Sequence, residues 1–284
     1  MKKLFILILF TMIEINLNAQ SCCGSTTTFA SNDGNMAVFV GDKNFRDIHQ
    51  SPAVYVHHSM VGGAMITFKT NEKDANAYLI KAKKITNKWL FVYQEWWGLN
   101  DNIKKQADAF YNDLGGAVNV LAIDMYDGKL ATTPDVAGKY MQEAKEDRLE
   151  AIMKGAIDYV GKKAKIASVG WCFGGGLSLK SAILEGKQAV GCVMYYGMPV
   201  QDVEKLKTLQ TDVLGHFATE EWISKKVIEE FAANMKSANK VLEYKIYDAP
   251  HAFANPSNQK FNKEFADDAF KKSIAYFKKK FGLK

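Results

Sequence analysis

The chain is organised around residues 165–176, which read KIASVGWCFGGG. A short apolar run ends at Gly170 and a helical pattern follows Gly174, so the stretch predicts a strand, a sharp turn and a helix. Glycines on both sides let the backbone turn tightly, and we expect Cys172 to stand exposed at the end of the strand. Free N–H groups at the start of a helix would lower the pKa of the thiol and could hold an oxyanion. We therefore interpret Cys172 as a nucleophile, although the motif alone also fits a tight turn around a buried cysteine.

Strand and helix patterns alternate on both sides of this turn. Helical spacing of apolar residues appears after Asp101 and again near the C-terminus, from Phe270 to Phe281. Alternating strands and helices predict an α/β fold with a mainly parallel sheet and helices on both faces. The runs of strand length are residues 64–69, 89–93, 119–124, 165–169, 189–196, 211–217 and 241–247.

Composition excludes several classes of protein. The 284 residues are 48% hydrophobic and 24% charged, as in soluble globular proteins, and one large domain is expected. The net charge of +6 is spread along the chain without an arginine-rich block, so nucleic acid is not an expected partner. His57 and His58 are adjacent and have no carboxylate or cysteine cluster beside them, which favours a surface loop. The sequence therefore predicts neither a metal site nor a cofactor.

The first residues have the pattern of a secretory signal peptide. A basic start, an apolar run over residues 4–12 and the small residue Ala19 predict removal of residues 1–19 and export, with the periplasm as the expected location. The apolar run is too short for a stable membrane span. Lipid attachment at Cys22 is the alternative, but the leucine usually found three places before such a cysteine is missing. Residues 20–62 have no clear period and are interpreted as an extension before a domain at 63–284.

Candidate partners for the thiol follow the last two predicted strands. His251 comes after the final strand, where a general base is expected, and Glu220 and Glu221 come after the strand before it. The chain order of nucleophile, acid and base is that of serine and cysteine hydrolases with parallel sheets. The residues alone leave the choice between Glu220 and Glu221 open.

From Ala64 onward the sequence resembles the dienelactone hydrolase family. The motifs that carry the resemblance are QEWWGLN at 94–100, DMY at 124–126, GWCFGGG at 170–176, YYG at 195–197 and PHAF at 250–253. The resemblance implies an α/β-hydrolase fold and a triad of cysteine, histidine and acid that opens a small-molecule ester or lactone through an acyl-enzyme.

The resemblance also assigns roles around the triad. It implies that Glu95 holds the resting thiol until substrate binds and that the backbone N–H groups of Trp96 and Phe173 form the oxyanion hole. Tyr126 and Asn255 are assigned to the substrate pocket.

The sequence departs from the family pattern in two respects. The acid is a glutamate where the family usually has an aspartate, and its loop is one residue shorter than in the family. Counting back from Trp222 matches the family's acid to Glu220, whereas counting forward from Phe217 matches it to Glu221; we choose Glu220 and keep Glu221 as the alternative. Gly128, with Lys129 next to it, and Asn255 stand where members that act on dienelactone have arginines. Because a bidentate carboxylate clamp is missing, dienelactone itself is not the expected substrate. A binding protein on a hydrolase scaffold is the alternative function, and the oligomeric state stays open.

Overall fold

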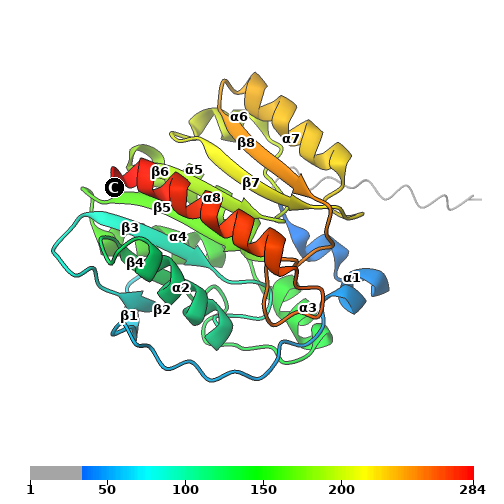
Figure 1. Cartoon of the computed structure of the whole chain (residues 1–284), viewed down its shortest axis with the longest axis horizontal. Helices are drawn as coiled ribbons and strands as arrows, with labels where there is room; N and C mark the ends of the chain where they lie inside the picture. The colour runs from blue at the N-terminus through cyan, green and yellow to red at the C-terminus, as the bar shows by residue number, and fades with distance from the viewer. Residues whose placement is uncertain (1–33) are drawn as a thin grey trace, which may run out of the picture. The chain divides into compact units, whose positions relative to one another are not determined.

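A single mixed sheet dominates the computed structural model, which describes residues 34–284. Its eight strands within this range follow the order β1-β2-β4-β3-β5-β6-β7-β8, and neighbours from β4 onward run parallel. The predicted mainly parallel sheet is therefore confirmed (Figure 1). The strands are β1 (Ala64–Phe68), β2 (Ala75–Ile80), β3 (Lys88–Tyr93), β4 (Asn119–Ile123), β5 (Lys165–Trp171), β6 (Ala189–Tyr195), β7 (Val213–Ala218) and β8 (Leu242–Tyr247).

Helices cover both faces of the sheet. Figure 1 shows α2 and α8 crossing in front of the strands, and Phe110 of α2 packs on Phe270 of α8 with ring centroids 4.8 Å apart. Helix α5 lies on the opposite face, where it packs against α4, β5 and β6. The helices are α1 (Lys43–Ile48), α2 (Asp101–Asp113), α3 (Pro134–Glu143), α4 (Glu146–Val160), α5 (Phe173–Glu185), α6 (Val203–Thr208), α7 (Lys225–Ser237) and α8 (Lys263–Phe281), with short 3-10 turns at Met36–Phe39 and Gly186–Gln188.

Strand β2 is the one strand of the described sheet that the sequence pattern missed. It pairs antiparallel with both β1 and β4 and is mostly buried. Its sequence, ANAYLI, starts with residues of low β propensity, and a run this short has no decisive period. Burial between two strands overrides that weak local preference.

The register of the central strands brings distant loops to one edge. Tyr93 of β3 lies opposite Gly170 of β5, and Ala218 of β7 lies opposite Tyr247 of β8. Because these strands run parallel, the residues that follow each strand emerge at the same edge of the sheet. The loops after β3, β5, β7 and β8 therefore form one site.

The described part of the N-terminal extension packs on the domain. Met36, Phe39 and Phe45 belong to the hydrophobic core, and the Trp222 indole donates a hydrogen bond to Asp42 at 2.9 Å. This anchoring fixes α1 beside α3 (Figure 1). The proposed signal peptide and Cys22 lie outside the described residues, and no helix within residues 34–284 is long and apolar enough to cross a membrane.

The two adjacent histidines of this extension have different surroundings. His58 is exposed, as expected for a surface loop. The side chain of His57 is only 6% exposed and lies 3.1 Å from the Asp108 carboxylate, so the surface interpretation was wrong for His57. A buried carboxylate 51 residues away in sequence gives His57 a structural partner that no local pattern reveals.

Candidate active site

Cys172 sits on the sharp turn that the glycine pattern predicts. Strand β5 ends at Trp171 and α5 begins at Phe173, so the turn consists of Cys172 alone, with φ 56° and ψ −122°. A non-glycine residue adopts such angles only where the surrounding structure enforces them. A Cβ on Gly170 would collide with the Gly174 carbonyl, which explains why glycine is required at this crossing of strand and helix.

The environment of the thiol differs from the sequence expectation. Cys172 is 1% exposed, so the prediction of an exposed side chain was wrong. Burial, together with the negative charge of Glu95, raises the pKa of the thiol well above its ordinary value, although a lowered pKa was expected. The backbone N–H groups of Phe173 and Trp96 do point at the sulfur and act in the opposite direction. Both proposed oxyanion donors therefore converge on the nucleophile.

His251 and Glu220 form a buried pair beside the sulfur. Nδ1 of His251 lies 2.9 Å from each carboxylate oxygen of Glu220, and the two side chains are 0% and 3% exposed. A single N–H shared between two oxygens at equal distance is the geometry of an imidazole donating to a carboxylate. Burial lowers the pKa of His251 to about 3 and raises that of Glu220. Of the two glutamates left open by the sequence, the structure brings Glu220 to His251 and leaves Glu221 exposed.

Glu95 lies at the same site but contacts a different partner from the one expected. Its carboxylate accepts a hydrogen bond of 2.6 Å from the Asn255 amide, and burial raises its pKa to about 7. Within the described residues no hydrogen bond joins Glu95 to the thiol. Glu95 and Asn255 instead line a small hollow together with Trp171 and Lys105.

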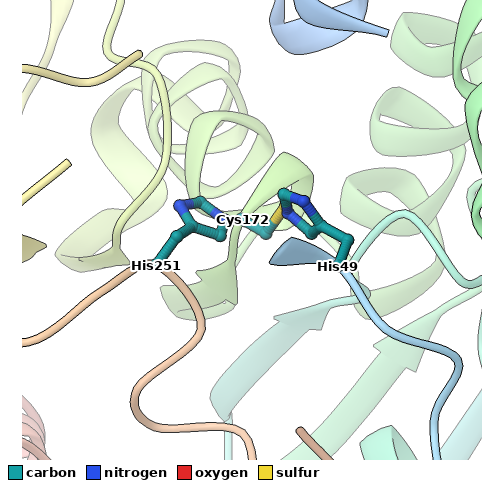
Figure 2. Close-up of side chains that lie close together, drawn as sticks. All are labelled: His49, Cys172 and His251. Carbon is teal, nitrogen blue, oxygen red and sulfur yellow. The ribbon is translucent and has the colours of Figure 1, made fainter. Parts of the chain in front are cut away.

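The side chain that contacts the thiol belongs to a residue that the sequence did not single out. Nε2 of His49, which follows α1, lies 3.6 Å from Sγ of Cys172. Nδ1 of His49 lies 2.6 Å from the carbonyl oxygen of Phe45; a carbonyl can only accept, so the hydrogen resides on Nδ1 and Nε2 presents a lone pair to the thiol. Figure 2 shows Cys172 between the rings of His49 and His251. No local motif marks His49, because its role depends on how the extension folds back.

Unpaired polar atoms cluster around these residues. His251 Nε2, the hydroxyls of Tyr126 and Tyr196, and Nε1 of Trp96 are buried without a hydrogen-bond partner in the described structure. The ring of Tyr126 stacks on Phe173 and that of Tyr196 packs on His251, with centroids 5.6 and 4.8 Å apart. Buried polar groups are normally satisfied, so such a concentration is typical of a site that a ligand completes.

Comparison with known proteins defines the class of this molecule. A family model described as "Dienelactone hydrolase family" matches residues 75–281, so the chain belongs to the dienelactone hydrolase family. It is a hydrolase with the α/β-hydrolase fold, acting on small molecules.

Individual relatives agree with this placement. The chain is 29% identical over 236 residues to "Protein usf" of Aquifex pyrophilus, covering 76% of this chain and 98% of that protein. It is 25% identical over 234 residues to a protein of Aquifex aeolicus named "Putative carboxymethylenebutenolidase", with the same coverage. The crystal structure of a "Putative Dienelactone Hydrolase" from Klebsiella pneumoniae superposes with a TM-score of 0.66 at 18% identity, over 76% of this chain and 97% of that one.

Proposed function

We propose that the protein hydrolyses a carboxylic ester or lactone through a thioester on Cys172. The observation that carries the proposal is the convergence on one sulfur of two backbone N–H donors and the His251–Glu220 pair. The ligating atoms of Cys172 and His251 lie within 4.8 Å of each other, and the imidazole has to come closer to the thiol to take its proton. Acyl transfer needs a nucleophile, a base that takes its proton and donors that hold the oxyanion. The thiol, the His251–Glu220 pair and the two backbone N–H groups supply these three functions.

The reaction follows from the protonation states of these groups. Nε2 of His251 takes the thiol proton, Sγ bonds to the carbonyl carbon, and the N–H groups of Phe173 and Trp96 hold the oxyanion. His251 then gives the proton to the leaving alkoxide as the C–O bond breaks. Water, deprotonated by His251, cleaves the thioester and restores the thiol. Glu220 keeps the hydrogen on Nδ1 and stabilises the imidazolium that forms.

Substrate must reach a sulfur that is closed off in this arrangement. Cys172 and His49 are 1% and 3% exposed, and the His49 ring occupies the space directly beside Sγ. An acyl group therefore enters when His49 moves aside. The hollow next to Glu95 and Asn255 is the natural place for the remainder of the substrate.

The substrate we propose carries no carboxylate next to the reacting group. At the two positions where arginines are expected, Lys129 next to Gly128 pairs with Glu143 and the neutral amide of Asn255 bonds to Glu95, so no guanidinium is available to hold a substrate carboxylate. A carboxylate would also lie near Glu95 and Glu220, which are both acidic. An uncharged ester or lactone fits this environment better than dienelactone.

Hydrolysis of short aryl esters tests the proposal. Wild type is expected to cleave them and to accumulate a thioester on Cys172 that mass spectrometry detects, whereas Cys172→Ala does neither. Cys192→Ala is the matched control, because that cysteine lies on β6, where it is buried beside Ser178 of α5. Equal rates for wild type and Cys172→Ala would refute the proposal and favour a binding protein on the same scaffold.

We also propose that the protein is exported, with residues 1–19 removed. The support is the sequence pattern of a basic start, an apolar run and a small residue at Ala19. Fractionation of the native cells with N-terminal sequencing tests this. A mature chain that begins at Gln20 is expected; a cytoplasmic chain that retains Met1 would contradict it, and a lipid-linked Cys22 would replace it with the anchored alternative.

A further inference from the structure

Three ligand atoms of the kind that zinc prefers meet at the centre of the site. They are Sγ of Cys172 and Nε2 of both His49 and His251, all within 4.8 Å of one another and all from buried residues (Figure 2). The other nitrogen of each imidazole is already engaged, on Phe45 and Glu220 respectively. Both Nε2 atoms consequently carry lone pairs directed to the same small volume. Nε2 of His251 is buried without any partner there.

The spacing suits a tetrahedral ion. With Zn–S of about 2.3 Å and Zn–N of about 2.05 Å, tetrahedral angles place sulfur and nitrogen about 3.6 Å apart. The observed distance between Cys172 Sγ and His49 Nε2 is 3.6 Å. Two nitrogens of such a site are about 3.3 Å apart, whereas the three ligand atoms here lie within 4.8 Å of one another, so His251 has to move towards the ion on binding. A fourth position remains for water or another small ligand.

The outer contacts are those that accompany zinc-bound histidines. Ligating imidazoles usually donate their second N–H to a carboxylate or a backbone carbonyl, and here His251 has the first and His49 the second. Glu95 and Glu220 are the charged residues that act on Cys172, and both are acidic. A dication replaces the repulsion among the thiolate and these carboxylates with attraction.

We propose that Cys172, His49 and His251 bind Zn²⁺ and that the bound ion holds the enzyme in an inactive, closed state. On binding, the S–H bond breaks, the Zn–S bond forms and one proton passes to solvent, whereas the two neutral histidines release none. The ligated thiolate is no longer a free nucleophile. The ion also ties His49, and with it α1, across the reacting sulfur. Metal binding stands independently of catalysis, and only the inhibitory consequence rests on the proposed function.

Direct binding measurements test the site without relying on activity. All proteins are full-length and carry Cys22→Ser and Cys23→Ser, which removes the other cysteines near the N-terminus. Zn²⁺ is titrated against a chromophoric chelator, and Co²⁺ is added separately to record absorption. We expect one ion per chain, release of about one proton per ion, and the thiolate charge-transfer and intense d–d bands of tetrahedral Co²⁺.

Single substitutions test whether the proposed ligands are required for Zn²⁺ binding. His49→Gln and Cys172→Ala should each weaken Zn²⁺ binding at least about 100-fold, more than loss of an outer contact does. The control His58→Gln, at an exposed position nine residues from His49, should bind as the parent does. Circular dichroism verifies that each variant is folded, and His251→Gln provides a second loss of ligand if one of them is not. Binding that survives His49→Gln, or Co²⁺ spectra without a thiolate band, would overturn the proposal.

Ester hydrolysis distinguishes this proposal from the proposed function. Stoichiometric Zn²⁺ should abolish hydrolysis by the parent protein, and a chelator should restore it. A chain that binds Zn²⁺ through these residues but never cleaves esters would contradict the proposed function and leave the metal site standing. A chain that cleaves esters and has no affinity for Zn²⁺ would contradict the metal site alone.

Discussion

Glu185 gives a quantitative test of how burial acts on charge in this core. It ends α5, the helix that begins directly after Cys172, and is 3% exposed. Its Oε1 accepts a hydrogen bond of 2.7 Å from Ser181, while Oε2 has no hydrogen-bond partner in the described structure. Burial raises the pKa of Glu185 from 4.5 to about 8. The folded protein therefore keeps this carboxyl protonated at pH values where the unfolded chain has released the proton.

The sign and size of the effect follow from that difference. The raised pKa contributes stability that is fully present below the unfolded value of 4.5 and is lost as the pH rises towards about 8. Each unit of difference amounts to about 1.4 kcal/mol. Between about pH 5 and about pH 7.5, ionisation of this group should lower the free energy of unfolding by about 3 kcal/mol. Glu185→Gln keeps an oxygen for Ser181 and does not ionise, so it escapes this loss.

Urea unfolding followed by tryptophan fluorescence measures the effect at both pH values. The difference in free energy of unfolding between Glu185→Gln and wild type should move by about 3 kcal/mol in favour of the variant as the pH rises. Glu230→Gln, an exposed substitution of the same kind, should show almost no movement. The substitution of an amide for the carboxyl group can itself change the free energy of unfolding, but that change is the same at both pH values and cancels when the two differences are compared. A difference that stays constant from about pH 5 to about pH 7.5 would refute the reasoning.

Three further results are expected. Glu220→Gln should lower kcat for ester hydrolysis by about 10²–10⁴-fold without unfolding the protein, because the imidazole loses its orienting carboxylate, whereas Glu221→Gln should stay within about twofold in the same assay. Gly170→Ala should prevent formation of soluble protein, because its Cβ meets the Gly174 carbonyl, while Gly41→Ala, with open space around the new carbon, should melt near the wild-type temperature. Burial lowers the pKa of His216 from 6.5 to about 3, so stability is lost as the pH falls below 6.5. As the pH falls from about 7 to about 4.5, the free energy of unfolding of His216→Gln should rise relative to that of wild type by roughly 2.5 kcal/mol, as measured by urea unfolding at both pH values. If the difference in free energy of unfolding between the two proteins does not change with pH, His216 is not the group responsible.

The sequence was informative where chemistry depends on short local patterns. A glycine-flanked cysteine between a strand and a helix needs only a few residues to be recognised, and the structure has the turn at Cys172. The loops after β7 and β8 could be located because parallel strands deliver their ends to one edge. The choice between Glu220 and Glu221 depended on loop length, which counting alone left open. The contact of Glu220 with His251 distinguishes the two positions.

The expected thiol pKa was wrong because a local effect was weighed without its surroundings. A helix N-terminus contributes about 0.3–1 kcal/mol, which is less than one pKa unit. Complete burial shifts a pKa by up to about 3–5 units in the direction that disfavours the charged form. The sequence shows the helix after Cys172 but not the packing that leaves the residue 1% exposed. Burial is the larger effect, so the resting group is a thiol.

His49 could not be predicted from the chain because its position depends on a long-range packing event. Phe45 packs on the rings of Trp96 and Trp222, which come from two different loops of the domain, with centroids 5.6 and 5.3 Å apart. This anchoring sets the end of α1 above the nucleophile and points His49 at the sulfur. Helical or strand periodicity carries no information about such a contact.

The placement of His49 separates the groups proposed for catalysis from a residue proposed for its control by Zn²⁺. Residues 75–281, which match the family model, contain the proposed nucleophile, base and acid, whereas His49 lies outside them. The buried thiol of Cys172 and the neutral imidazole of His251 offer two zinc ligands, which is one fewer than the three protein ligands of typical open zinc sites. The N-terminal segment supplies the third, His49, from the position directly after the six-residue helix α1. Substrate reaches the sulfur only when His49 moves aside, whereas the proposed ion needs His49 in place, so Zn²⁺ and ester should compete for one sulfur through the position of one histidine.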